Sequence, residues 1–207
     1  MTQEKYKAIS EIEIEDTIEY VKIREHDQLD FSNILECNHC YFEKVCFTDL
    51  NFQNISCYDA IFKNCDFSNV IWNSNSEFAS PYLHKVTFDN CKMVGTDFGM
   101  TTIKKVKFQN CVGRYVNFSF ATMNEVKIIS CSFQNMILQD TNCKKLLLQD
   151  NELLDLELLH TSLKDVDITS NHIEGLKTDL ESIRGMIVNS SQALQLSGLL
   201  GIIVKEL

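Results

Sequence analysis

The sequence predicts an all-β solenoid with four short sides per coil, because two periods are superimposed on it. Large apolar residues recur at almost every fifth position from Phe88 to Leu148, and mostly small or β-branched residues stand two positions before them. Neither the 3.6-residue period of a helix nor the two-residue period of a strand produces this spacing. A second period of 20 aligns Cys91, Cys111 and Cys131, so four units make one coil. Such coils stack at about 4.8 Å and complete one another's core.

Individual units carry a specific pattern. Residues 65–69 and residues 96–100 each read as a small residue, Asp, Phe and two further residues. This pattern resembles the pentapeptide-repeat family, and the resemblance covers roughly residues 29–173. It implies a right-handed quadrilateral parallel β-helix. A hexapeptide-repeat β-helix is the nearest alternative, but a step of six leaves the ladder of Phe residues at once.

The N-terminal residues 1–28 do not follow the five-residue rule cleanly. Residues 11–15 alternate with a period of two, which indicates a half-buried strand. We expect residues 1–28 to be a cap, because the end of a solenoid must be protected against edge pairing. Ile18 and Ile23 are candidates for the start of a first coil.

The β-helix proper is expected over residues 29–188, with one irregularity inside it. The phase of the large residues shifts by one between Trp72 and Phe78, within a run of Asn and Ser. A bulged or slightly enlarged corner is expected there, either as a neutral insertion or as a functional loop. The candidate partner-binding loop consists of Asn73, Ser74, Asn75, Glu77, Pro81 and Tyr82.

The C-terminal part changes character in two steps. After Leu148 the inward positions become Leu and Ile, and Asn151 and Asn171 continue the Cys column, where they can form a hydrogen-bonded ladder. Residues 189–207 are expected to form a helix, capped by Asn189 with Gln192 as capping-box partner, and then a short strand over residues 202–204. A helix this short must dock to be stable, so a dimer interface is predicted at Leu194, Leu196, Leu199, Leu200, Ile202 and Ile203.

Composition excludes several functional classes. The chain of 207 residues has a net charge of −10 and nine Cys, most of them in inward repeat phase, where reduced Cys acts as a small core residue. A cytoplasmic protein without a membrane span or secretory signal is therefore expected. The pair Cys37 and Cys40 has no matching second pair, so no metal site is predicted. The five His residues show no pairing with a nucleophile or with each other, and neither a cofactor nor an enzymatic activity is expected.

The C-terminal residues carry a finer resemblance. Residues 192–194 and 199–202 look like the C-terminal segment of the Qnr group of quinolone-resistance proteins. That resemblance implies a tail-to-tail homodimer that mimics DNA, binds DNA gyrase and topoisomerase IV, protects them from quinolones and does not itself bind nucleic acid. The chain departs from the group by lacking two long loops and by having a basic middle. A scaffold for an unrelated protein partner and an immunity protein against a gyrase-directed peptide stay open as alternatives.

Charge is distributed unevenly along the sequence. Residues 81–148 hold nine Lys and Arg against four Asp and Glu, whereas both flanking regions are acidic. In a tail-to-tail dimer the acidic C-terminal coils would lie at the centre, where they could attract a basic DNA-binding surface. The partner-binding acidic residues predicted on this basis are Asp150, Glu152, Asp155, Glu157, Asp165, Asp167 and Glu174.

Overall fold

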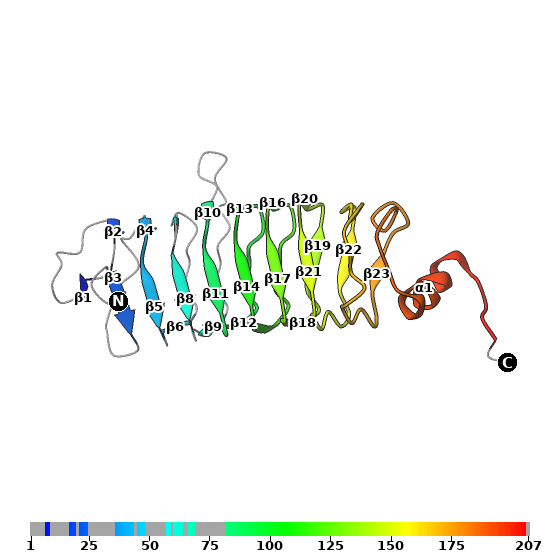
Figure 1. Ribbon diagram of the computed structural model, residues 1–207, viewed down its shortest axis with the longest axis horizontal. Coiled ribbons are helices and arrows are strands. Elements are labelled where there is room, and N and C mark those ends of the chain that lie inside the picture. The colour runs from blue at the N-terminus through cyan, green and yellow to red at the C-terminus, as the bar shows by residue number, and fades with distance from the viewer. Residues whose placement is uncertain are drawn as a thin grey trace.

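The computed structural model describes residues 7–8, 17–19, 21–24, 36–43, 45–48, 57–58, 60–63, 66–68 and 82–205. In these residues, short parallel strands stack into an elongated solenoid, and one helix lies at its C-terminal end (Figure 1). The predicted parallel β-helix is therefore confirmed.

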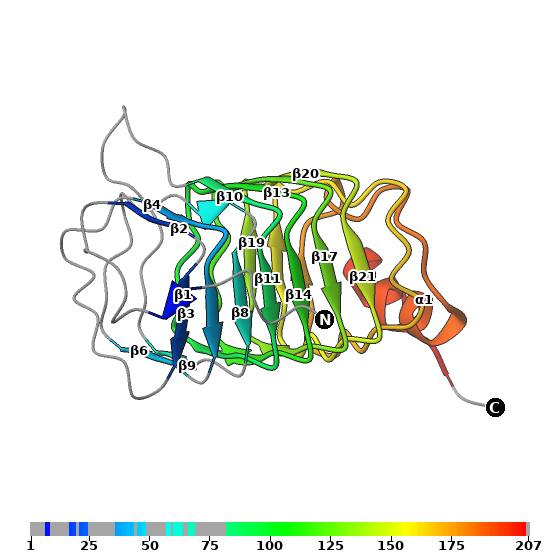
Figure 2. The ribbon, with the colours of Figure 1, turned by 60° about the vertical axis from the view of Figure 1, so that its left-hand side comes forward.

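The strands line four sides, which the chain visits in a fixed order. Side 1 is an eight-stranded sheet made of β1 (Lys7–Ala8), β3 (Val21–Arg24), β5 (Tyr41–Glu43), β8 (Ile61–Lys63), β11 (Thr87–Asp89), β14 (Lys107–Gln109), β17 (Lys127–Ile129) and β21 (Leu147–Gln149). Side 2 contains β6 (Cys46–Thr48), β9 (Asp66–Ser68), β12 (Lys92–Val94), β15 (Val112–Arg114) and β18 (Ser132–Gln134). Side 1 faces the viewer in Figure 2.

The remaining strands complete the coil. Side 3 contains β19 (Ile137–Gln139), β22 (Glu157–Leu159) and β23 (Lys177–Thr178). Side 4 contains β7 (Cys57–Tyr58), β10 (Tyr82–His84), β13 (Thr102–Lys104), β16 (Thr122–Asn124) and β20 (Asn142–Lys144). A further pair joins β2 (Thr17–Glu19) to β4 (Glu36–Asn38). Because the chain turns at each corner, side 1 and side 3 face opposite directions, and so do side 2 and side 4.

The inward columns follow the predicted register. Phe88 pairs with Phe108, and Phe108 pairs with Ile128, each at a spacing of 20 residues. The rings of Phe88 and Phe108 stack with their centroids 4.9 Å apart, and both side chains are fully buried. Continuous stacking of this kind removes apolar area from water that no single coil could bury alone.

The corners are formed by residues two positions after each large inward residue. Lys105, Asn110 and Tyr115 have φ values of 55°, 54° and 58°, which lie in the left-handed region. This conformation costs a non-glycine residue roughly 1–2 kcal/mol. A hydrogen bond to the next coil accompanies each turn, as in the 2.8 Å contact from the Lys105 amide to the Asn124 carbonyl. The corners therefore take part in the stacking of the coils.

One coil is larger than the sequence phase indicated. Cys57 pairs with Leu83, and Phe62 pairs with Phe88, so 26 residues separate positions that are 20 apart elsewhere. The predicted phase shift of one position is correct, but six residues are inserted where a single-residue insertion was considered, because a five-residue phase cannot distinguish one inserted residue from six. The candidate loop residues Asn73, Ser74, Asn75, Glu77 and Pro81 lie outside the described residues, and Tyr82 begins β10.

The first coil and the last helix match their predictions in part. Ile18 and Ile23 pair with Cys37 and Phe42, so both belong to the ladder. The helix α1 (Ser190–Ser197) has the predicted capping box and is followed by the 3₁₀ helix η3 (Gly198–Leu200). The strand predicted over residues 202–204 is absent from the described chain, which leaves the body there (Figure 1). A strand needs a neighbouring backbone to bond with, and a single chain offers none at this point.

Candidate protein-interaction surfaces

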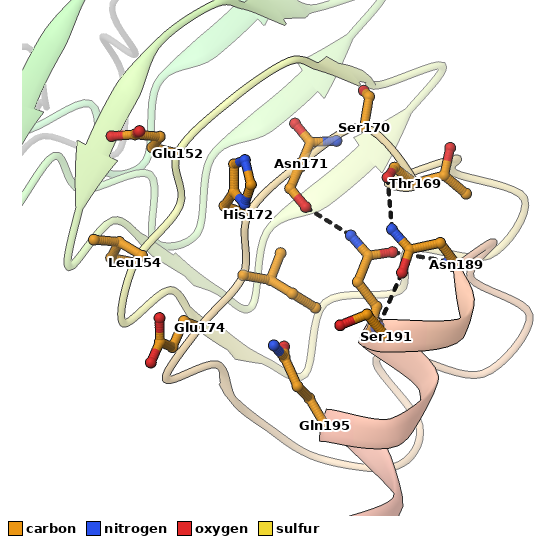
Figure 3. Close-up of a pocket in the computed structure, with 12 residues that line it drawn as sticks. Glu152, Leu154, Thr169, Ser170, Asn171, His172, Glu174, Asn189, Ser191 and Gln195 are labelled. Atoms are coloured by element: carbon orange, nitrogen blue, oxygen red, sulfur yellow. Dashed lines mark hydrogen bonds between the residues drawn. The ribbon is translucent and has the colours of Figure 1, made fainter.

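The last coils are joined to the helix by a ladder of buried amides. The Asn151 side-chain amide donates to Asn171 Oδ1 at 2.8 Å, and the Cys131 backbone amide donates to Asn151 Oδ1 at 2.9 Å. Gln192, in the first turn of α1, continues the ladder, because its Nε2 donates to the carbonyls of Asn171 and Ile168 at 2.7 and 2.9 Å. The predicted Asn ladder is confirmed, and Gln192 extends it to α1. Figure 3 shows Asn171 beside the first turn of α1, where the ladder meets the helix.

A second ladder of hydroxyl groups runs down the inward column at the opposite corner of the coil, before side 4. The Thr141 amide donates to Thr161 Oγ1 at 2.9 Å, and the Thr161 amide donates to Ser182 Oγ at 3.0 Å. The column ends at Asp179, which accepts hydrogen bonds from the His160 amide and from Ser182. These bonds lower the pKa of the Asp179 carboxyl to about 2. Both ladders hold the coils that carry the predicted acidic surface.

The predicted dimer residues are largely uncovered in the single chain. Leu194, Leu200 and Ile203 expose 51%, 63% and 86% of their surface, while the polar Gln192 is the buried residue of α1. Leu199 and Ile202 are also exposed, and Leu196 is half-buried. The helix is therefore attached by a polar side chain and presents apolar side chains outward, which is the arrangement that an interface requires.

The predicted acidic residues separate into two groups. Glu152 and Glu174 lie on side 2, Glu157 lies on side 3, and Asp150 and Asp155 lie at the corners that bound side 2. We call these five residues the acidic surface. The other two predicted residues are placed elsewhere: Asp165 lies at the corner between side 4 and side 1, and Asp167 lies on side 1. The expectation that they extend the same field was wrong, because Asp165 and Asp167 lie at the end of side 1 that adjoins side 4, whereas the acidic surface begins at the other end of side 1, at Asp150.

A cavity lies between the acidic surface and the helix. It has a volume of about 410 Å³, and Figure 3 shows its polar lining. Glu152 pairs with His172 in the next coil, and Glu174, Asn189, Ser191 and Gln195 complete much of the wall. Sequence reasoning did not single out His172 or Gln195, although the 20-residue period places His172 directly beside Glu152. The cavity joins the acidic surface to the helix.

The basic residues of the middle segment are also sorted by side. Lys92 and Arg114 lie on side 2, where the Arg114 guanidinium lies 5.6 Å from the centre of the Tyr115 ring. The other seven lie on side 4, on side 1 or at the corner between them: Lys85, Lys104, Lys105, Lys107, Lys127, Lys144 and Lys145. The positive charge is therefore concentrated along one edge of the solenoid, away from the acidic surface.

The buried thiols belong to the core. Burial raises the pKa of Cys143 to about 12. The hydrogen bond with the Cys111 thiol and burial both raise the pKa of Cys131. Thiols with raised pKa values stay protonated and react slowly. The described residues contain no group of three or more His, Cys, Asp or Glu suited to a metal ion. In the part of the chain that is described, no helix is long and apolar enough to cross a membrane.

Part of the chain matches a known protein family, and solved structures show a lower similarity to it. Residues 60–129 match the family model described as a pentapeptide repeat region. A trypsin-treated variant of QnrB1, a plasmid-mediated fluoroquinolone resistance protein, is 19% identical over 96% of both chains, with a TM-score of 0.44. HetL, a pentapeptide repeat protein involved in heterocyst differentiation regulation from the cyanobacterium Nostoc, is 9% identical over 84% of this chain and 90% of its own, with a TM-score of 0.27.

No curated protein matches the chain. The family match and the strand register nevertheless point to the same unit, because the 20-residue pairing continues beyond the matched residues as far as the bridge between Asp167 and Ile187. The chain thus contains a pentapeptide repeat region, set in a parallel β-helix that continues the same repeat towards the C-terminus.

Proposed function

We propose that this chain is a non-enzymatic binding protein that forms a homodimer, binds DNA gyrase or topoisomerase IV through a DNA-like acidic surface and protects the enzyme from quinolones. The observation that carries the proposal is the position of the uncovered apolar helix beside the acidic surface. Pairing of two such helices would bring two acidic surfaces together at the centre of the dimer.

The mechanism rests on charge and on rigidity. Glu152 stands on a bridge and Glu157 on a strand of stacked coils. Glu174 lies in the adjoining turn, where its carbonyl accepts a 2.8 Å hydrogen bond from the Asp155 amide of the preceding coil. A surface that is ordered before binding loses little conformational entropy when a partner docks. Opposite charges on the enzyme's DNA-binding surface would accelerate the encounter and would make it sensitive to salt.

A supercoiling assay tests the proposed function. Gyrase is incubated with relaxed plasmid, a quinolone and increasing amounts of this protein, and both supercoiled product and drug-induced cleavage are measured. We expect less cleavage at protein concentrations that leave much of the supercoiling intact. Cleavage that does not change at any protein concentration, with gyrase and with topoisomerase IV, would contradict the proposal.

A scaffold for an unrelated protein partner is the second candidate. Val94, Val112 and Tyr115 are large, exposed and close together on side 2 and its corner, several coils away from the helix. A dimer centred on the helix would leave this group uncovered. Tyr and adjacent Arg are residues that often dominate protein interfaces. A protein that has no effect on either topoisomerase would favour this candidate.

A further inference from the structure

The edge between side 4 and side 1 carries a charge opposite to that of the rest of the chain. We call this edge the basic ridge and define it as residues 84–87, 104–107, 124–127, 144–147, 164–167 and 184–187, which occupy equivalent places in successive coils. The ridge holds nine Lys and Arg against three Asp and Glu, whereas the remaining sequence holds ten against 26. Positive charge is therefore sorted onto one edge of an acidic protein.

Lysines of the ridge recur at equivalent places in nearby coils, which lowers the stability of the fold. Lys107 and Lys127 are direct partners on adjacent strands, and Lys104 is followed two coils later by Lys144 on the same side. Like charges placed directly opposite each other destabilise a sheet. Glu125 offsets part of the charge, since its carboxylate lies 3.5 Å from the Lys145 ammonium. Folding alone does not call for this arrangement, so an anionic partner is the simplest reason for it.

The surroundings of the lysines favour phosphate groups over a protein partner. Thr102, Thr122, Asn142 and Ser162 line side 4 beside the ridge, and they offer hydroxyl and amide donors of the kind that bind phosphate oxygens. Among the residues whose burial is described, the exposed aromatic side chains that could anchor a protein, Tyr115 and Phe120, lie at other corners. On the ridge, Leu147 and Ile187 are the large apolar side chains that are exposed, and they lie two coils apart.

We propose that the basic ridge binds the sugar–phosphate backbone of duplex DNA without reading its sequence. From residue 84 to residue 184 the ridge crosses five coil steps, or about 24 Å at the strand spacing, which matches about seven base pairs of duplex. The ridge is separate from the acidic surface, so this binding does not depend on the proposed action on topoisomerases. It revises the expectation, implied by the resemblance to the Qnr group, that the protein does not bind nucleic acid.

The test measures affinity for DNA as a function of salt. The full-length protein is titrated into a fluorescent duplex of about 20 base pairs in NaCl from about 50 to 200 mM, and anisotropy gives the association constant. Each phosphate contact contributes about −0.9 to the slope of log K against log salt. We expect a slope near −5, and the variant K104Q/K105Q/K107Q should reduce its magnitude by about three.

A matched control removes the same charge from other places. The variant K92Q/K177Q/K205Q also loses three Lys residues, but these lie on side 2, on side 3 and in the C-terminal tail. Its slope should stay close to that of the parent. An equal loss in both variants would show that net charge alone governs binding, and would overturn the proposal. No binding of the parent at about 50 mM NaCl would do the same.

A lysine-acetylation footprint tests the same proposal on the parent protein. It therefore applies even if a variant does not fold. Duplex DNA should protect Lys104, Lys105, Lys107 and Lys127 from acetylation and should leave Lys177 and Lys205 reactive. Equal reactivity of all these lysines with and without DNA would contradict the proposal. A ridge variant that binds DNA like the parent but no longer binds a topoisomerase would instead identify the ridge as a protein-binding surface, which also overturns it.

Discussion

At the scale of single residues, Gly113 shows how tightly the coils are packed. It occupies an inward position where other coils carry a large residue, and it pairs with Phe133. A Cβ added at Gly113 would lie 2.6 Å from the Met93 carbonyl oxygen, a distance that requires the backbone to move. The neighbouring coil therefore fills the space that the missing side chain leaves.

The substitution G113A should therefore destabilise the protein. We expect a loss of about 1–3 kcal/mol in the free energy of unfolding, as overpacking in a close-packed core typically causes. The control is G198A, because a Cβ there meets nothing within 4 Å. Urea unfolding followed by circular dichroism measures both variants, and equal stability of the two would show that the coil tolerates the extra atom.

Gln192 tests whether the helix is held by its polar side chain. Its Nε2 bonds two carbonyls of the last coils, and its Oε1 accepts from the Asn189 amide at 2.9 Å. Replacing it with Ala removes the side-chain donor to the buried Asn171 carbonyl, which should cost about 1–3 kcal/mol. Hydrogen exchange should then speed up in α1, while Q195A, an exposed position on the same helix, should behave like the parent. Unchanged exchange in Q192A would mean that the helix is held by other contacts.

Asp179 predicts how the stability of the protein changes at acidic pH. Because its pKa in the folded chain is about 2, below the ordinary value of about 4, its contribution to stability is present above about pH 4 and is lost as the pH falls towards 2. The substitution D179N should lower stability at pH 7 and should flatten the dependence of stability on pH between about 4 and 2. Unfolding curves at several pH values measure this effect, and parallel profiles for the parent and D179N would contradict it.

At the scale of elements, the repeat was predictable and its interruptions were not. The column from Phe88 to Ile128 followed from spacing alone, because every inward position repeats the same environment. The number of extra residues between β9 and β10 did not follow from spacing, because the insertion of a whole five-residue unit leaves the phase of the inward residues unchanged. The absent strand over residues 202–204 marks another limit: the apolar run predicts a strand, but only a second backbone could complete it.

The exposed tail therefore predicts a homodimer. Leu200 and Ile203 are largely uncovered, and their replacement by charged residues would prevent apolar contact between two copies. We expect the parent to have the mass of a dimer by light scattering at micromolar concentration, and L200E/I203E to have the mass of a monomer. The solenoid should stay folded in that variant, since neither residue belongs to its core. A monomeric parent would rule the dimer out.

At the scale of the whole molecule, charge is organised by side as well as along the chain. The sequence showed acidic ends around a basic middle, but side 1 separates Asp165 and Lys164 from the acidic surface, although they follow it closely in sequence. Counting in steps of five from Asp150 would have placed them at or beside the corner between side 4 and side 1. The sequence therefore predicted that acidic residues form the candidate site. Which of them share one surface could be decided only after each residue had been assigned to one of the four sides.

The central claim is that the acidic surface on side 2 and side 3 binds a topoisomerase. Its most direct test is the affinity of this protein for gyrase over a salt series, measured for the parent, for E152Q/E174Q and for D165N/D167N. Both variants lose two carboxylates, but the second pair lies on side 1 and its corner with side 4. We expect E152Q/E174Q to bind roughly tenfold more weakly at low salt, with the difference shrinking as salt screens the charges, and D165N/D167N to bind like the parent. Equal affinities for all three proteins across the series would contradict the claim.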